Sequence, residues 1–297
     1  MAFLKDELEG FVPTEQQKEI MKEITLGSTL LKLSKVEPMK SDKKTIPVLT
    51  EGPGAYWVGE GDRIQTSSAQ WIHPEIEAKK IAVIVPVTKE KLADTVIDVF
   101  KEITPEIAKA FYLTIDGAGL FGVNSPFAKS LFSVAKDSEN LIENGTGNTF
   151  DIDVSNAMAL VEAAGHDVTG FVGHRGLKNT LRTLRDTNGN QIYVPGVTQN
   201  ELYGSTVEFA SNGGFDKTKA DLIMGNFDYS LVGIREGIKY EILKEATLHS
   251  QIMPDGKPLS LAENDMVAIK ATMRLGFLPI KEDAFAAITP KETTTQG

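Results

Sequence analysis

The chain has no cysteine among its 297 residues. This absence excludes disulfide bonds, thiolate zinc sites and cysteine nucleophiles. Only four histidines are present, and none forms a His-x-x-x-His or Glu-x-x-His set that would place two metal ligands on one helix face. The sequence also lacks a G-x-S-x-G elbow and a Walker loop. We therefore expect no catalytic residue, no cofactor and no metal ion.

Long apolar runs and an excess of positive charge are missing as well. No stretch of eighteen apolar residues is present, so no membrane-spanning helix is expected. The N-terminus, MAFLKDELEGFVP, carries acidic residues where a signal peptide has a basic start, which favours a cytoplasmic protein. The net charge of −10 argues against a nucleic-acid-binding surface, because such surfaces cluster Lys and Arg against phosphates.

One long helix is the most prominent element that the sequence predicts. Between Thr88 and Gly122, apolar residues recur at spacings of three and four, and they are Leu92, Val96, Val99, Ile103, Ile107 and Phe111. Thr88 is expected to cap the first turn, and Gly117 and Gly119 are expected to mark the exit. From Lys89 to Asp116 such a helix would be roughly 42 Å long.

Pro105 interrupts this pattern. A proline inside a helix removes one hydrogen bond and costs about 3 kcal/mol. Either the helix bends there, or a second helix begins with Thr104 as its cap and Pro105 in its first position. Both alternatives give a long rod with a bend. Taken alone, the helix pattern favours the alternative of an ordinary buried helix in an enzyme domain.

The segment before this helix is expected to be extended and poorly packed. Residues 1–29 favour helix, with Thr14 and Gln17 at the spacing of a capping box, and Leu30 to Leu49 reads as short strands. Gly52 to Val87 then leads out through a glycine-rich stretch and returns along a strand in which Ile76, Ala78, Ala82 and Ile84 alternate. Its aromatic residues either need a partner surface or fold back on the same chain, and they are Tyr56, Trp57 and Trp71.

The rest of the chain predicts a mixed α/β region followed by a long strand. Asn124 to Asn148 resembles a loop, and Asp151 or Asp153 is expected to cap a helix that Gly165 ends. Two strands are expected to be joined by a tight turn at Arg235-Glu236-Gly237. The final strand has one buried face, formed by Val267, Ile269, Ala271 and Met273, and the tail TPKETTTQG is expected to be disordered.

Three short motifs could carry chemistry, and each has a simpler explanation. Gly117 to Gly122 matches G-x-G-x-x-G, but it ends a helix instead of opening one after a strand, which favours a helix stop. Asp186 to Asn190 resembles the start of a calcium loop but has Gln191 and Val197 at two required positions, so it is interpreted as a polar turn. The pair Asp151 and Asp153 lies where helix caps are expected.

Several stretches together resemble the major capsid proteins of tailed bacteriophages, the phage capsid family with the Hong Kong 97-type fold. The matching pieces are AYWVGEG from Ala55, AKKIAVIVPVTKEKLADT, FVGHRGLKNTLRTLRDTNGN, ELYGSTVEFA, ADLIMGNFDYSLVGIREGIKYEI and ENDMVAIKATMRLGFLPIKEDAFAAI. Each is weak alone. Their order and spacing cover roughly residues 30–290, which makes the resemblance specific.

The resemblance implies an α+β fold with a role for each segment. Residues 1–50 would be an N-terminal arm and 51–87 an extended loop lying across a neighbouring subunit. Residues 88–130 and 246–290 would form a peripheral domain with the long helix as its spine, 131–245 an axial domain, and 291–297 a disordered tail. The helix bend near Pro105 would matter when a precursor shell expands.

The implied function is a structural shell subunit of the virion and not an enzyme. Pentamers and hexamers would close into an icosahedral head around double-stranded DNA, without sequence-specific binding, after assembly in the host cytoplasm. A portal and a separate scaffolding protein would be partners, because only 54 residues precede Ala55, too few for a scaffolding region. Trp57 to Ala78 contains no Lys, so cross-linking through a lysine of the loop is not expected.

Two rival functions stay open at this stage. One is an encapsulin-like compartment of the same fold, which a groove for a cargo peptide would favour. The other is a nucleotide-using enzyme built on Gly117 to Gly122, which stabilisation by a nucleotide would support.

Overall fold

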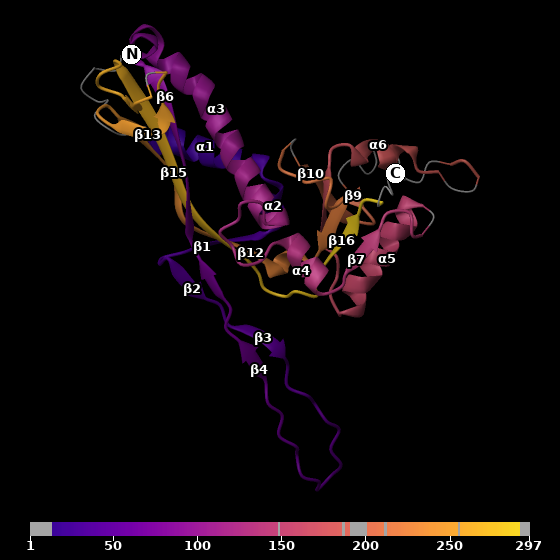
Figure 1. Cartoon of the computed structure of the whole chain (residues 1–297). Coiled ribbons are helices and arrows are strands. Elements are labelled where there is room, and N and C mark those ends of the chain that lie inside the picture. Colours follow the sequence, from indigo (N-terminus) through magenta and orange to yellow (C-terminus); the bar gives the residue numbers. More distant parts are fainter. Residues whose placement is uncertain are drawn as a thin grey trace.

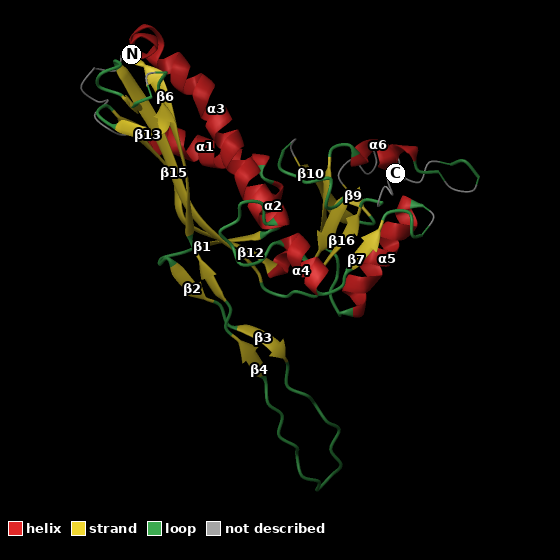
Figure 2. Ribbon diagram, in the orientation of Figure 1, coloured by secondary structure: helices red, strands yellow, loops and turns green. Residues whose placement is uncertain are grey.

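The chain forms two sheet-based parts and one long projection (Figures 1 and 2). The computed structural model describes residues 14–147, 149–185, 188–190, 201–210, 213–254 and 256–291, of which 14–19, 50–51 and 90–102 are described by their backbone only. Helices and strands are segregated into separate layers, which makes the fold α+β as expected. No helix in the described residues is long and apolar enough to cross a membrane.

The first part is a four-stranded sheet covered by the long helix α3 (Lys89–Phe121). The strand order is β1 (Lys35–Pro38), β12 (Ser230–Leu243), β15 (Met266–Pro279) and β6 (Lys79–Thr88). The long antiparallel pairs β12–β15 and β15–β6 form its centre. As predicted, the alternating residues Val267, Ile269, Ala271 and Met273 are all buried. Three of them, Ile269, Ala271 and Met273, pack toward α3, because they share a core cluster with Ile107 and Phe111 of that helix.

The second part is a six-stranded mixed sheet. Its strand order is β7 (Leu141–Glu143), β16 (Phe285–Thr289), β11 (Leu222–Gly225), β8 (Gly170–His174), β10 (Ser205–Ala210) and β9 (Glu201–Leu202). Helices α5 (Phe150–Ala163) and α6 (Leu177–Thr183) pack with one face of this sheet in a core of their own. The other face contributes Val172, Ile223 and Ala287 to the large core that also contains α3. The two parts therefore share one continuous apolar interior.

Smaller elements connect these parts. Helices α1 (Thr14–Gly27) and α2 (Thr29–Leu33) lie against α3, and α4 (Leu131–Asp137) packs against β16. A 3₁₀ turn (Phe227–Tyr229) leads into β12, and β13 (Thr247–Ile252) pairs with β14 (Pro258–Ser260). The remaining short strands β2 to β5 belong to the projection.

The long helix differs from the prediction at both ends and at its proline. It is one helix of 33 residues with Pro105 inside it, so no second helix begins at Thr104. The predicted exit at Gly117 and Gly119 is wrong, since the helix continues to Phe121 and Gly122 ends it with a φ of 68°. Thr88 is the N-cap residue, but its side chain makes no capping hydrogen bond. The predicted apolar residues Leu92, Val96 and Val99 lie outside the described side chains.

Three predicted loops and strands also need correction. Leu30 to Leu33 forms the helix α2, because its first turn is capped, and only Lys35 onward is extended. The described part of Asn124 to Asn148 is not a plain loop but contains α4 and β7. The predicted turn at Arg235-Glu236-Gly237 is an irregularity inside the single strand β12, whose pairing with β15 shifts register there.

The alternation in the returning strand is also broken. Ile76 is buried, but Ile84 is 43% exposed, although both would share a face of one continuous strand. The strand is interrupted at Ala78 between β5 (Glu75–Glu77) and β6, and this interruption moves the buried face of β6 to the odd-numbered residues. The buried side chains of β5 and of β6 therefore lie on different faces of the segment.

The sheets also cut across two of the expected domain boundaries. The expected axial domain, which ends at residue 245, includes β12, yet β12 is a central strand of the sheet next to α3. The expected peripheral residues 246–290 include β16, yet β16 lies inside the six-stranded sheet. Hydrogen bonding between strands far apart in sequence decides these memberships. The expected tail, 291–297, lies outside the described residues beyond residue 291.

Candidate assembly surfaces

The projection is made of two short, separate β-ladders followed by a long open loop (Figure 1). β2 (Lys43–Thr45) pairs with β5, and β3 (Val48–Glu51) pairs with β4 (Gln70–Ile72). Two-stranded ribbons of this length have little stability of their own in water. The projection therefore depends on its attachment at the base.

Ile76 anchors that base. Its side chain is only 1% exposed and forms a small core with Met39 and Leu231. The projection approaches the sheet closely at Gly276. A Cβ on this residue would lie 2.7 Å from the carbonyl oxygen of Glu77. Any larger residue there would push the projection off the sheet. Charged groups add to the attachment, since Asp42 pairs with Arg235 and with Arg274.

The loop at the far end, residues 52–69, exposes large apolar side chains. Trp57 is fully exposed, Ile64 is 78% exposed and Tyr56 is 56% exposed. Few internal contacts hold the loop, such as the hydrogen bond from the Gly54 backbone N–H to the Ser67 Oγ at 2.7 Å. The aromatic residues do not fold back on the same chain. They form a surface that no other described residue covers, which is typical of interaction sites.

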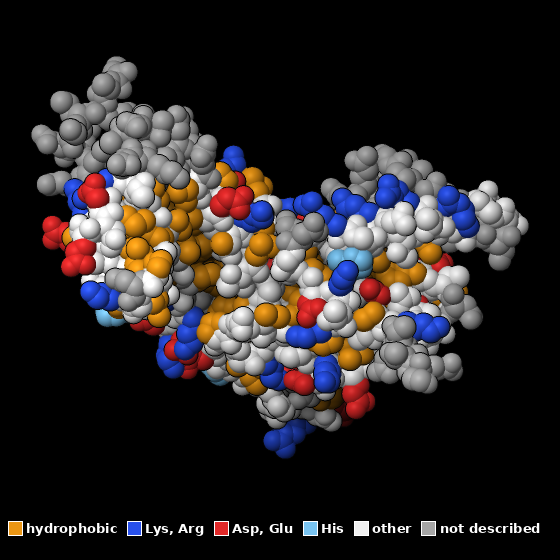
Figure 3. Space-filling model, turned by 45° about the horizontal axis from the view of Figure 1, so that its top comes forward, with side chains coloured by type: hydrophobic (Ala, Val, Ile, Leu, Met, Phe, Trp, Pro, Cys, Tyr) orange, Lys and Arg blue, Asp and Glu red, His pale blue; other side chains and the backbone are white. Residues whose placement is uncertain are grey.

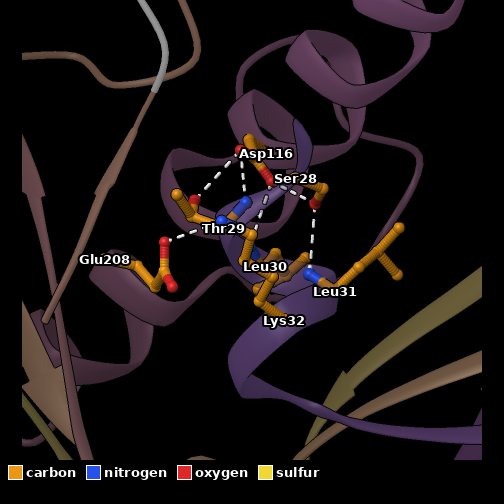
Figure 4. A network of polar contacts seen from close by, with 7 residues as sticks. All are labelled: Ser28, Thr29, Leu30, Leu31, Lys32, Asp116 and Glu208. Carbon is orange, nitrogen blue, oxygen red and sulfur yellow. Dashed lines mark hydrogen bonds and ion pairs between the residues drawn. The ribbon is translucent and has the colours of Figure 1, made fainter. Parts of the chain in front are cut away.

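The junction between the two sheet-based parts has the opposite character. Asp116, near the end of α3, is completely buried. Its carboxylate accepts hydrogen bonds from the Ser28 Oγ at 2.5 Å, from the backbone N–H and the Oγ1 of Thr29 at 3.0 Å each, and from the Leu30 backbone N–H at 3.1 Å (Figure 4). These donors include free N–H groups at the first turn of α2. Asp116 therefore caps a helix that lies far away in the sequence.

Burial dominates the electrostatics of this carboxylate. Loss of solvation raises the pKa of Asp116 above its ordinary value, while the hydrogen bonds from Ser28, Thr29 and Leu30 act in the opposite direction. Sequence reasoning missed this residue. The available signal for a buried carboxylate was an acidic residue that follows Phe111 and Ile115 on the apolar side of a helix.

The short helix α2 also reaches the second part of the molecule. Lys32 forms an ion pair with Glu208 of β10 at 2.9 Å, and the Ser34 and Ser230 hydroxyls share a hydrogen bond at 2.6 Å. The fit against α3 is close, since a Cβ on Gly119 would lie 2.3 Å from the Leu30 side chain. Helix α2 thus contacts α3, the four-stranded sheet and the six-stranded sheet at one point.

The sequence motifs with possible chemistry are explained by local structure. Gly117 to Gly122 forms the last turn and cap of α3, so the glycines do not precede a helix as a dinucleotide site requires. Gly117 lines a hollow of about 430 Å³ together with Leu113, Phe121, Val123, Asn124 and the loop 213–216. This lining is largely apolar and holds one acidic residue, Asp216.

The acidic pair after the loop 144–147 has a structural role that differs from the predicted cap. The N-cap of α5 is Thr149, and both Asp151 and Asp153 lie in the first turn. The Asp153 carboxylate accepts hydrogen bonds from the backbone N–H groups of Gly145 at 2.7 Å and Gly147 at 2.6 Å, which fixes the preceding loop. Gly165 ends the helix with a φ of 84°, as predicted.

Metal binding finds no support in these groups. Asp186, the first residue of the calcium-like motif, lies outside the described residues. In the part of the chain that the structure describes, no three His, Asp or Glu side chains converge on one point.

Fold and surfaces together define a class of protein: an α+β subunit with an outlying apolar loop and a tightly bonded interior. The chain belongs to the phage capsid family, whose model matches residues 9–289. The predicted resemblance is therefore confirmed.

The similar proteins agree with this membership. The chain is 32% identical to a "Major capsid protein" of Staphylococcus phage 80alpha over 296 residues, which cover 99% of this chain and 89% of that protein. It is 22% identical to a "Probable major capsid protein gp17" of Mycobacterium phage D29, covering 94% of this chain and 90% of that one. A solved structure titled Microbacterium phage Oxtober96 superposes with a TM-score of 0.78 at 32% identity, covering 89% of this chain and 91% of that chain.

Proposed function

We propose that this chain is the repeating subunit of an icosahedral phage head, built from pentamers and hexamers around double-stranded DNA. The observation that carries the proposal is the projection: its loop, residues 52–69, exposes Trp57, Tyr56 and Ile64 far from any core of its own chain. A second copy is the natural partner for this surface in a protein that belongs to the phage capsid family. The proposed role is structural and not enzymatic.

The physical argument rests on repetition. A specific contact between proteins buries about 1,600 Å² in total, and a closed shell multiplies each such contact by the number of subunits. Individual contacts can then be modest while the whole particle is stable. The exposed aromatic residues of the loop are suited to this role, because tryptophan and tyrosine are enriched among the few residues that dominate the energy of interfaces.

Each part of the molecule receives a role in this proposal. The projection, within residues 51–87, lies across a neighbouring subunit. Helix α3 and the four-stranded sheet form the peripheral domain of a Hong Kong 97-type fold, and the six-stranded sheet with α5 and α6 forms the axial domain around the symmetry axes. Assembly takes place in the host cytoplasm with a separate scaffolding protein and a portal.

The net charge supports passive enclosure of DNA. A chain with a charge of −10 repels phosphates on average, so an acidic inner wall would let DNA be packed and released without adhering. A shell of this kind would contain DNA without reading its sequence.

The experiment is negative-stain electron microscopy of the purified protein with and without a co-expressed scaffolding protein. We expect the natural chain to form closed shells, and a variant lacking Gly59 to Gln70 to remain a folded monomer with an unchanged melting temperature. Trp57→Ala should also prevent shells, while the control Trp57→Phe, which keeps an aromatic ring, should permit them. Normal shells from the deletion variant would contradict the role given to the loop.

A further inference from the structure

The two ladders of the projection differ in the side chains on their faces. We call the β2–β5 pair the base ladder and the β3–β4 pair the outer ladder. In an antiparallel ladder, residues directly opposite each other share a face, and successive residues of one strand lie on opposite faces. The register of each ladder therefore determines which side chains share a face.

The base ladder has one apolar face and one charged face. Ile76 lies on the first face and is buried at the base of the projection. The opposite face carries Lys43, Glu75 and Glu77, and the Lys43 Nζ forms an ion pair with Glu75 at 3.0 Å. Such alternation is typical of a ribbon that is covered on one side and solvated on the other.

The outer ladder is apolar on both faces. Leu49 lies opposite Trp71 on one face, and Val48 lies opposite Ile72 on the other. Trp71 is 54% exposed, Ile72 is 43% exposed, Leu49 is 39% exposed and Val48 is half-buried. Figure 1 shows this ladder standing clear of both sheets. Opposite faces of one ribbon therefore expose large apolar side chains that no described residue buries.

Two apolar faces require two covering surfaces. Packed sheets lie about 10 Å apart, so surfaces that cover both sides of the ladder would be about 20 Å from each other. The hollow of about 430 Å³ beside α3 is too small to enclose a ribbon covered in this way. One molecule on each face is therefore favoured over a single molecule that clamps both faces.

Composition favours protein over nucleic acid or lipid as the covering material. Neither β3 nor β4 contains Lys or Arg, so phosphates would meet no cation there. The loop beyond the ladder contains Glu60, Asp62 and Arg63, which would have to enter a bilayer before the ladder could.

Apolar surface of the required kind is present on the chain itself. Figure 3 shows a band of hydrophobic side chains over the left-hand part, which contains the four-stranded sheet. Val36 of β1 and Ile84 of β6 are exposed apolar residues of that sheet. The outer ladder also continues directly into the loop 52–69, whose exposed aromatic residues are assigned to a second copy. A copy of this chain is therefore the partner that both faces fit.

We propose that two neighbouring copies of this chain hold the outer ladder between them, one on the Leu49–Trp71 face and the other on the Val48–Ile72 face. The proposal rests on the proposed shell function and specifies how many neighbours each projection contacts. Three chains meet at every projection. In a closed shell of identical subunits, each copy would extend one projection and supply, on average, two covering surfaces.

Substitutions confined to one face test whether both faces are needed. Leu49→Thr with Trp71→Thr removes one apolar face, and Val48→Thr with Ile72→Thr removes the other, while threonine preserves the preference for a strand. Each double variant should reduce the yield of shells by at least about tenfold, because a repeated contact is lost from every subunit. A natural yield of shells from either double variant would overturn the proposal.

The matched control lies on the charged face of the base ladder. Lys43→Thr with Glu75→Thr makes the same number of changes in the same projection, and exposed ion pairs contribute little to stability. This control should assemble within about twofold of the natural chain. Melting temperatures of all three double variants should match that of the natural chain, since no buried side chain changes.

Counting cross-linked chains tests the number of neighbours directly, even if a variant cannot assemble alone. Because the natural chain has no cysteine, Trp71→Cys and Ile72→Cys each supply a single thiol for a maleimide photo-cross-linker, on opposite faces of the ladder. Each labelled chain is mixed as a minor fraction with the natural chain before shells form. In the isolated shells, either single-cysteine chain should give a product of two chains on a denaturing gel. The chain with both cysteines should give a product of three chains, and the control Lys43→Cys should give none.

The outcomes distinguish this proposal from the shell function. If the chain with both cysteines yields only two-chain products, one copy covers both faces and the proposal is wrong. A face that gives no product, or that cross-links to a co-expressed scaffolding protein, contradicts it equally, as would cross-linking of the Lys43→Cys control at the same yield. In each of these cases the shell function stands, because the natural chain still forms shells. If the natural chain forms no shells, with or without scaffolding protein, both proposals fail.

Discussion

The loop of residues 52–69 exposes a large apolar side chain to solvent, whereas the junction around α2 buries a carboxylate. In the loop, Trp57 is fully exposed to solvent. In the junction, Asp116 is completely buried and bonded to Ser28, Thr29 and Leu30. Buried polar groups and exposed apolar groups are the informative exceptions to the usual distribution of residues. The buried Asp116 finds its hydrogen-bond partners inside the chain, whereas the exposed Trp57 is left to contact another molecule.

This difference separates stability from association. Residues of the junction are expected to determine the free energy of unfolding, since every partner of Asp116 belongs to the same chain. Residues of the loop are expected to have little effect on unfolding and a large effect on assembly. Substitutions in the two regions can test that separation directly.

The largest effect on stability is expected for Asp116→Ala. Removal of the carboxylate leaves the donors of Ser28, Thr29 and Leu30 buried without an acceptor, which should lower the free energy of unfolding by about 3 kcal/mol or more. Chemical denaturation followed by circular dichroism measures this loss. Asp116→Asn keeps one acceptor oxygen and should lose less, and equal stability of the alanine variant and the natural chain would refute the role of Asp116.

The same residue gives the junction a pH dependence with a definite sign. Burial raises the pKa of Asp116, so the folded chain holds this proton more tightly than the unfolded chain does. The resulting contribution to stability is complete below the unfolded pKa of about 3.9 and is lost as pH rises through the raised value. The stability of the natural chain relative to Asp116→Asn should therefore fall with rising pH in that window. A constant difference would contradict this.

The same substitution, isoleucine to alanine, can be made in a buried and in an exposed position, so that the two environments are compared directly. Ile76→Ala at the buried base of the projection should cost about 2–5 kcal/mol, because it leaves a cavity between Met39 and Leu231. Ile64→Ala in the loop, where the side chain is 78% exposed, should change stability by less than about 0.5 kcal/mol and reduce assembly instead. Denaturant titration measures the free energy of unfolding of each variant, and light scattering measures its assembly. Similar stability losses at both sites would erase the distinction.

The smallest expected effect is a gain in stability. The hydroxyl of Tyr240 in β12 is buried without a hydrogen-bond partner among the described residues. Burial raises the pKa of Tyr240, which agrees with a hydroxyl removed from water. Tyr240→Phe should raise the free energy of unfolding by about 1 kcal/mol, as measured by thermal and chemical unfolding. A loss of stability would show that this hydroxyl has a partner.

Local patterns in the sequence predicted elements well where one physical rule dominated. The alternation at Val267, Ile269, Ala271 and Met273 correctly predicted one buried face of β15, because a strand with a single covered side repeats every two residues. The spacing in α3 predicted a long helix, and the exposed aromatic residues were correctly assigned to a segment without a core. The predicted helix end was wrong, because Gly119 allows close packing inside the helix: an added Cβ there would lie 2.3 Å from the Leu30 side chain.

The junction could not be predicted, because its energy comes from contacts across long sequence separations. Ser28 and Asp116 are 88 residues apart, and no local pattern indicates that one caps the helix next to the other. The same limit explains the errors at β12 and β16, whose sheet membership follows from partners far along the chain.

The sequence by itself determined the family, the α+β composition, the long helix and the presence of an underpacked projection, since these follow from composition, periodicity and the order of short motifs. Only the tertiary structure decided where α3 ends, which sheet receives β12 and β16, and that Asp116 joins α2 to α3. The physical reason is that periodicity reports which face of an element is apolar. It carries no information about which distant backbone groups will meet that face and complete its hydrogen bonds.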